Sequence, residues 1–273
     1  IGLHKTGTTS IQSHLSEIVG LNYLGTAFPR AANSDLYTDV LTAICNSCPD
    51  SDMANLSRLG SRVRRLFNKG VIVSDELIFC GAGDTFGGRN CIRDRLRVTA
   101  EIFKGFRVVV VLSTRSPADG IYSLYCQKYN YFKDMNWTDL CFVPWIQESY
   151  STRAYELIEQ YFPKSRITLI DFDQCSDMTS EFRAVVEEFF DIQESQSAKF
   201  ENTSKYVEDG TMVTVSPFSR FFLFTKKILG PFSKLPILKF VARFLIKITS
   251  KQQKVPFPTR AEKEFVRDFF DKI

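Results

Sequence analysis

Short runs of apolar, mostly β-branched residues recur along the chain and are separated by longer stretches with helical periodicity. The strongest runs cover residues 107–113 (RVVVVLS) and 166–172 (RITLIDF). Residues 71–74 form a moderate run, and residues 22–25 are a weaker fourth candidate. Runs of this length that are apolar on both faces are typical of parallel strands covered by helices on both sides.

Amphipathic segments occupy the intervals between these runs and predict helices. They cover residues 9–19, 34–45, 55–69, 92–104, 117–131, 138–161 and 178–190. Ser34 or Asp35 can cap the second segment, and Pro117 falls where a first-turn proline is tolerated. The alternation of strands and helices predicts an α/β fold, with a parallel sheet flanked by helices on both faces.

The pattern changes after Asn202, where Phe, Lys and Pro become frequent. Ten Lys and Arg but no Asp or Glu lie between Gly210 and Ala261, so the net charge of +4 leaves −6 for the remaining chain. We therefore divide the chain into a core, residues 1–205, and a helical, basic, Phe-rich C-terminal appendage or lid, residues 206–273. An acidic body with one basic segment implies an anionic partner, such as a phosphorylated cofactor, an acidic glycan or a lipid surface.

Two helices are expected in the C-terminal region. Lys239, Arg243 and Lys247 fall on one helical face within residues 217–257. This face suits an interfacial helix on anionic lipid, a lid over an acidic acceptor, or a helix packed on the core with its lysine stems lying along apolar surface. Thr259-x-x-Glu262 forms a capping box that predicts a terminal helix.

The N-terminal loop, residues 2–10 (GLHKTGTTS), is the most specific feature of the sequence. Its two glycines allow tight turns, and its Thr and Ser residues open a helix whose free amides point at an anion. The loop is not a Walker A motif, because Lys5 precedes Gly7 instead of following it. The strongest strand also runs into Ser113-Thr114-Arg115 instead of ending in a magnesium-binding Asp. These departures argue against an ordinary ATP-dependent kinase or ATPase.

Lys5-Thr6-Gly7-Thr8-Thr9 resembles the 5′-phosphosulfate loop of sulfotransferases that use 3′-phosphoadenosine-5′-phosphosulfate (PAPS). Residues 4–12 (HKTGTTSIQ) are especially similar to bacterial members of the carbohydrate-sulfotransferase type. The resemblance implies a P-loop-like sheet. It also implies that Lys5 contacts the oxygen bridging sulfate and phosphate. The implied cofactor-binding residues of this loop are Lys5, Thr6, Gly7, Thr8, Thr9 and Ser10.

A second motif strengthens the resemblance. The strand at 107–113 leads into Arg115, and Ser123 follows eight residues later, which resembles the family's 3′-phosphate motif. Arg115 is expected at the carboxyl end of its strand, the edge where α/β sheets bind ligands, and its fork suits a terminal phosphate. Residues 201–205 (ENTSK) resemble a later loop that closes over the nucleotide, so Lys205 is a further candidate ligand. The resemblance extends over residues 1 to about 205.

The acceptor must lose a proton as it attacks, so a base is expected near the sulfate. We favour Glu76, which follows the candidate strand at 71–74, with Asp75 as its close competitor; a helix-capping role is the alternative. His4 and His14 are the only histidines and are less well placed.

The sequence thus predicts transfer of a sulfuryl group from PAPS to a hydroxyl or amine of a glycan or glycolipid acceptor, with 3′,5′-ADP as product and no metal. The alternatives are a non-catalytic nucleotide-binding member of the same fold and an atypical P-loop phosphotransferase. No nucleic-acid partner is expected. We expect a cytoplasmic protein, with a peripheral membrane contact through residues 217–257, and upstream sequence before Ile1 to supply the strand that precedes the loop. Cys126 and Cys141 lie among apolar residues and are expected to be buried thiols.

Overall fold

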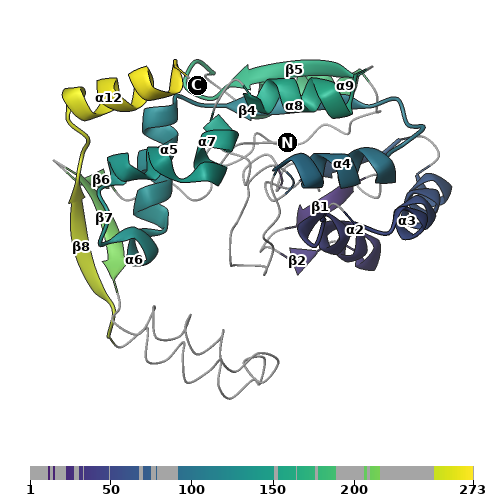
Figure 1. The fold of residues 1–273 in the computed structure, drawn as a ribbon, viewed down its shortest axis with the longest axis horizontal. Helices are drawn as coiled ribbons and strands as arrows, with labels where there is room; N and C mark the ends of the chain where they lie inside the picture. The colour runs from purple at the N-terminus through teal and green to yellow at the C-terminus, as the bar shows by residue number, and fades with distance from the viewer. Residues whose placement is uncertain are drawn as a thin grey trace.

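The computed structural model describes residues 12, 15, 23–27, 31–32, 34–48, 50–67, 70–74, 78, 92–150, 153–163, 165–175, 178–188, 206–207, 210–215 and 249–272. Over these residues the protein is a mixed α/β fold, mostly helical, with small sheets (Figure 1). No helix in this part of the chain is long and apolar enough to cross a membrane.

The first group of elements follows the predicted order closely. It comprises β1 (Tyr23–Ala27), β2 (Ala31–Ala32), α2 (Asp35–Cys45), α3 (Met53–Leu66), β3 (Ile72–Ser74) and α4 (Ile92–Ile102). The Ser34 hydroxyl caps α2 by accepting the Tyr37 amide at 3.1 Å, which decides between the two predicted caps. Helix α3 begins two residues before the predicted start, because the Asp52 carboxylate accepts the amides of the first turn.

The second group contains the strongest strands. It comprises β4 (Val109–Thr114), α5 (Pro117–Gln127), α6 (Tyr129–Phe132), the 3₁₀ helix η3 (Trp137–Phe142), α7 (Pro144–Tyr150), α8 (Arg153–Tyr161), β5 (Arg166–Asp171) and α9 (Met178–Glu187). The single helix predicted over 138–161 is wrong, since η3, α7 and α8 replace it. Pro144 has no amide hydrogen with which to continue η3, and it opens α7 instead.

The C-terminal region contains strands that the sequence analysis did not predict. Its elements are β6 (Tyr206–Val207), β7 (Gly210–Val215), β8 (Lys251–Pro256) and α12 (Arg260–Phe270). Strands β7 and β8 pair antiparallel along their whole length, from Gly210 opposite Pro256 to Val215 opposite Lys251. The region expected to be a helical appendage therefore contains β-strands as well as the terminal helix. The terminal helix and its capping box are confirmed, with the Thr259 hydroxyl accepting the Glu262 amide at 3.3 Å.

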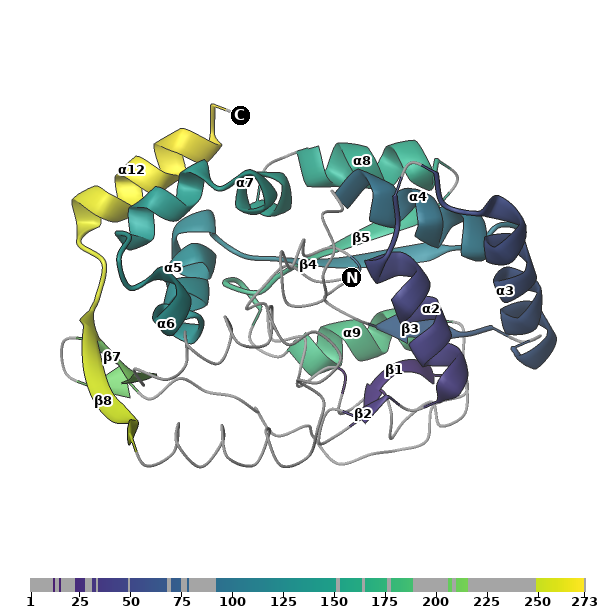
Figure 2. The same ribbon diagram turned by 60° about the horizontal axis from the view of Figure 1, so that its bottom comes forward.

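The strands form three small sheets, ordered β2-β1-β3, β4-β5 and β6-β7-β8. Two pairings are parallel, β1 with β3 and β4 with β5. Figure 1 places β4 between β5 and the sheet that contains β1, and Figure 2 shows β4 and β5 together between α8 and α9. The predicted parallel pairing is thus present, but as two separate pairs of strands.

Shared apolar clusters hold these pairs together. Helix α4 buries Leu96 in the cluster that contains Val110 of β4, and Ile102 in the cluster that contains Leu24 of β1. A third cluster joins Tyr23 of β1 to Ile170 of β5. Because single helices and clusters contact both parallel pairs, the pairs are fixed relative to each other by burial of apolar surface.

The C-terminal elements are packed on the central helices. Val213 of β7, Val255 of β8 and Val266 of α12 belong to the same buried cluster as Ile121 of α5. The Trp137 indole donates to the Glu262 carboxylate at 3.2 Å, which joins η3 to α12. The boundary placed at residue 205 stays a prediction.

Candidate functional site

The junction between β4 and α5 places Arg115 at the carboxyl end of a parallel strand. The apolar run makes β4, and Ser116 and Pro117 then start α5 with proline at its first helical position. Gly120 lets α5 approach its neighbour closely, since a Cβ at this position would lie 2.5 Å from the Tyr150 ring. The sequence therefore fixes both the end of the strand and the direction of the helix.

Arg115 is held by contacts with the end of β5. Its Nε donates to Asp173 Oδ1 at 3.2 Å, and Asp173 Oδ2 accepts the Ser116 amide at 2.7 Å. The guanidinium carbon lies 4.9 Å from the centre of the Phe172 ring. The Arg115 side chain is 18% exposed, so it is largely buried but still reaches solvent.

A pocket of about 180 Å³ opens beside Arg115. Its first wall is one face of α5, formed by Asp119, Tyr122, Ser123 and Cys126, together with Arg115. The four α5 positions follow the spacing i, i+3, i+4, i+7, which places them on a single helical face. The structure thus brings Arg115 and Ser123, two of the predicted cofactor ligands, to one pocket.

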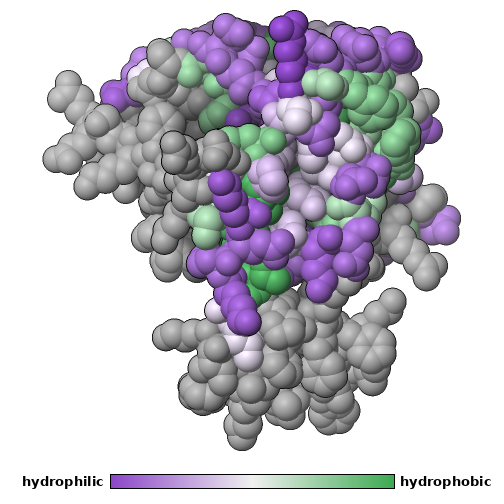
Figure 3. All heavy atoms as spheres, turned by 90° about the vertical axis from the view of Figure 1, so that its left-hand side faces the viewer, coloured by the Kyte–Doolittle hydropathy of each residue, from purple (hydrophilic) through white to green (hydrophobic). Residues whose placement is uncertain are grey.

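The second wall comes from the C-terminal region. It is formed by Thr211 of β7, by Phe257 and Pro258 after β8, and by Lys263 of α12. The Tyr122 hydroxyl joins the two walls, because it lies 3.2 Å from the Thr211 hydroxyl and 3.0 Å from the Pro256 carbonyl oxygen. Figure 3 looks onto the side of the molecule that carries β8 and α12, where hydrophilic side chains surround smaller apolar areas.

Two ion pairs lie at the pocket. Lys263 Nζ contacts Asp119 Oδ1 at 2.7 Å, and both side chains of this pair are more than a third exposed. The Arg115–Asp173 pair is less exposed. Two cationic side chains and a hydroxyl-bearing side chain thus line one pocket, and donors of these kinds can bind phosphate oxygens.

Glu262 helps to place α12. Burial would raise the pKa of its carboxyl group, but hydrogen bonds from the Thr259 amide, the Thr259 hydroxyl and the Trp137 indole outweigh this and lower the pKa. The carboxylate therefore stays ionised where α12 begins, one residue before Lys263. Negative charge in the first turn also interacts favourably with the helix dipole.

The other predicted site residues lie outside the described part of the chain. These are Lys5, Thr6, Gly7, Thr8, Thr9, Ser10, Glu76 and Lys205, with the competing bases Asp75, His4 and His14. The basic face at Lys239, Arg243 and Lys247 lies outside it too. Their roles stay predictions.

Sequence reasoning missed Lys263, Thr211 and Phe257 as pocket residues. The capping box located the start of α12, but no local pattern links that helix to α5, because the contact between Lys263 and Asp119 spans 144 residues of chain. A long-range contact of this kind has no periodicity signal.

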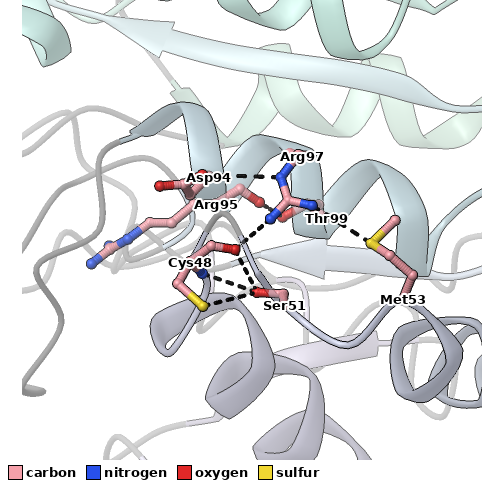
Figure 4. A network of polar contacts seen from close by, with 7 residues as sticks. All are labelled: Cys48, Ser51, Met53, Asp94, Arg95, Arg97 and Thr99. Atoms are coloured by element: carbon pink, nitrogen blue, oxygen red, sulfur yellow. Dashed lines mark hydrogen bonds and ion pairs between the residues drawn. The ribbon is translucent and has the colours of Figure 1, made fainter.

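A second polar cluster joins α4 to the loop between α2 and α3 (Figure 4). Arg97 donates to the Cys48 carbonyl oxygen and contacts Met53 Sδ, and the Ser51 hydroxyl contacts Cys48. Arg95 is 1% exposed and points away from these contacts (Figure 4). Arg97 links α4 to the α2–α3 region, whereas the Ser51–Cys48 contact is local to the loop, so we assign this cluster a structural role.

Within the described part of the chain, the free thiols are Cys45, Cys48, Cys126, Cys141 and Cys175. Cys126 and Cys141 are buried, which confirms that prediction, and burial raises the pKa of the Cys141 thiol to about 11. Across the described ranges, no three His, Cys, Asp or Glu side chains are grouped as a metal site requires. The expectation of metal-free chemistry stays a prediction.

Comparison with known proteins gives no match to a family model, to a curated protein or to a solved structure. Function is therefore inferred from the chain's own residues. The pocket offers Arg115, Ser123 and Lys263 at the end of a parallel strand. This arrangement can bind a terminal phosphate group.

Proposed function

We propose that the protein is a PAPS-dependent sulfotransferase acting on a hydroxyl or amine of a glycan or glycolipid acceptor. The observation that carries the proposal is the shared pocket of Arg115 and Ser123. These residues match the 3′-phosphate motif by sequence, and their positions on β4 and α5 suit the binding of one phosphate group. A separate 3′-phosphate distinguishes PAPS from ATP.

We further propose that the two parallel pairs belong to one P-loop-like sheet. The burial of Tyr23 and Ile170 in one cluster, and the contact of α4 with both pairs, support this arrangement.

The proposed reaction is an in-line displacement at sulfur. The acceptor oxygen or nitrogen forms a bond to sulfur as the bond from sulfur to the bridging oxygen of PAPS breaks, and Glu76 takes the acceptor proton. Lys5 and the amides of residues 6–10 stabilise the charge that develops on the leaving 3′,5′-ADP. Stabilisation of such developing charge usually accounts for more of the rate enhancement than any other single effect.

In this proposal, Arg115 and Ser123 hold the 3′-phosphate and thereby orient the sulfate toward the acceptor. Asp173 positions Arg115 through the contact at Nε. Lys205 closes over the nucleotide. Binding energy at the remote 3′-phosphate contributes to rate by fixing the reacting atoms in line.

The test is transfer of radiolabelled sulfur from PAPS to a panel of glycans and glycolipids, with release of 3′,5′-ADP measured in parallel. Wild-type protein is expected to label at least one acceptor. Lys5→Ala should abolish most of the turnover, whereas Glu76→Gln should retain 3′,5′-ADP binding and lose about two or more orders of magnitude in rate.

Other outcomes contradict the proposal in different ways. Tight binding of 3′,5′-ADP without labelling of any acceptor would indicate a non-catalytic nucleotide-binding protein. Preference for ATP with Mg²⁺ would indicate an atypical phosphotransferase. Normal turnover in Lys5→Ala would contradict the assignment of the loop.

A further inference from the structure

We infer that the C-terminal segment completes the 3′-phosphate site, with Lys263 of α12 as a third ligand of that phosphate and Asp119 of α5 as its competing partner. The inference rests on the proposed function, because the ligand is the 3′-phosphate of PAPS or 3′,5′-ADP. It assigns a binding role to a residue that lies outside both recognised sequence motifs.

The position of Lys263 carries the inference. Lys263 lines the same pocket as Arg115 and Ser123 but comes from the opposite wall, so the three side chains approach one cavity from two sides. A terminal phosphate has three oxygens, and donors on several sides of it are needed to satisfy them. The α5 wall alone supplies donors from one direction.

Helix α12 is fixed well enough to present this lysine. The Thr259–Glu262 capping box sets the start of the helix, and Glu262 also accepts the Trp137 indole at 3.2 Å. Three residues beyond Lys263, Val266 is fully buried against the central cluster. A lysine on an ordered helix loses less conformational entropy when it binds a phosphate than a lysine on an unordered segment does.

Asp119 competes with the phosphate for Lys263 and therefore lowers the affinity of the site for the phosphate. Its carboxylate contacts Lys263 at 2.7 Å, yet the side chains are 37% and 39% exposed, and exposed pairs of this kind contribute little to stability. An ammonium group has three N–H donors, so contact with one carboxylate oxygen does not exhaust it. A phosphate monoester carries a charge of about −1.5 to −2 near pH 7 and therefore competes with a single carboxylate for the lysine.

The same geometry predicts opposite effects for the two members of this pair. Removing the lysine charge takes a donor from the phosphate, whereas removing the aspartate charge takes a repulsive and competing group away from it. A purely structural ion pair gives a different result, because breaking it from either side has the same consequence for fold and binding. The sign of the Asp119 effect therefore separates the two roles.

Calorimetric titration with 3′,5′-ADP and with 5′-AMP tests the inference on the full chain. We expect Lys263→Gln to bind 3′,5′-ADP roughly 10-fold more weakly and Asp119→Asn to bind it roughly 3-fold more tightly, as one charge-assisted hydrogen bond predicts. Lys263→Arg should restore most of the affinity. Binding of 5′-AMP, which lacks the 3′-phosphate, should not change in any variant.

Arg260→Gln is the matched control, since Arg260 is a cation on the same helix that pairs with Glu264 and has a 92% exposed side chain. Its affinity for 3′,5′-ADP should equal that of the wild type. The inference is overturned if Lys263→Gln and Arg260→Gln bind alike, or if Asp119→Asn and Lys263→Gln both weaken binding. If the wild type itself does not prefer 3′,5′-ADP over 5′-AMP, the proposed function fails, and the inference fails with it.

Discussion

The two walls of the pocket each present a cation paired with a carboxylate, and the two pairs differ in how they are held. On the α5 wall, Asp173 uses one oxygen for Arg115 and the other for the Ser116 amide, and the guanidinium also lies over Phe172. On the C-terminal wall, Lys263 meets a single oxygen of Asp119, and both side chains are more exposed.

The Arg115 side chain is held by more contacts than the Lys263 side chain, so Lys263 is the one that can exchange its partner. Arg115 is tied to the ends of adjacent parallel strands, so its orientation is set before any ligand arrives. Lys263 depends on the docking of a helix distant in sequence and on an ion pair accessible to water, which contributes little by itself. In the proposed site, the first wall would therefore supply a fixed ligand, and the second would supply one that moves from carboxylate to phosphate.

The largest expected effect is on the fixed wall. Arg115→Gln should weaken binding of 3′,5′-ADP roughly 100-fold, because it removes the planar cation and leaves Asp173 without this partner. Calorimetric titration measures the change. Arg62→Gln is the control, since Arg62 forms an exposed pair with Asp39 far from the pocket residues in sequence. An Arg115→Gln protein with wild-type affinity would contradict the assignment.

The second-largest effect is expected at Tyr122, whose hydroxyl links the two walls of the pocket. Tyr122→Phe should lower the free energy of unfolding by about 2 kcal/mol, since it leaves the buried Thr211 hydroxyl and nearby carbonyl groups without this partner. Urea denaturation followed by circular dichroism measures the loss.

Tyr125→Phe is the matched control for the link. The Tyr125 hydroxyl donates to the Met135 carbonyl oxygen at 3.1 Å and does not join the walls. Removal of this hydroxyl should lower the free energy of unfolding by about 1 kcal/mol and leave nucleotide affinity unchanged. An equal or larger loss in Tyr125→Phe would contradict the role given to Tyr122.

The stability that the cap of α12 gives the protein should depend on pH, because the cap uses the Glu262 carboxylate. The pKa of Glu262 is lower in the folded protein than its ordinary value of 4.5, so its contribution is present above that value and is lost as the pH falls through the folded pKa. Glu262→Gln should therefore be less stable than the wild type at neutral pH, by about 1 kcal/mol for a lost cap. Urea denaturation at several pH values should show this gap closing in acid; a gap independent of pH would contradict the account.

The smallest effect is expected for the hydroxyl on α5. Ser123→Ala removes one neutral donor from the phosphate and should weaken 3′,5′-ADP binding roughly 5-fold without changing 5′-AMP binding. Competition binding against a fluorescent nucleotide resolves a change of this size. Equal losses for both nucleotides would show that Ser123 acts elsewhere than at the 3′-phosphate.

Arg115 and Ser123 of the α5 wall were predictable because their signals are local, whereas Asp119, Tyr122 and Cys126 were not predicted as pocket residues. The β-branched run fixes β4, Pro117 starts α5, and helical spacing then brings Ser123 round to the same side as Arg115. The terminal capping box was predictable for the same reason, since Thr259 and Glu262 are three residues apart.

The C-terminal wall was not predictable from local pattern. Strand β8 (KQQKVP) buries only Val255 among its six residues, so it lacks the alternation that marks a half-buried strand. The pairing of β8 with β7, and the contact of Lys263 with Asp119, arise from packing between distant segments. Pro144 also interrupts the amphipathic segment at 138–161. Hydrophobic periodicity alone predicted one continuous helix there.

The central claim is that the pocket beside β4 recognises a separate 3′-phosphate. Calorimetric titration of the wild-type chain with 3′,5′-ADP and 5′-AMP at one ionic strength tests it most directly. The account predicts that 3′,5′-ADP binds at least roughly 100-fold more tightly, because the cations of both walls contact the additional phosphate. Equal affinities for the two nucleotides would contradict it.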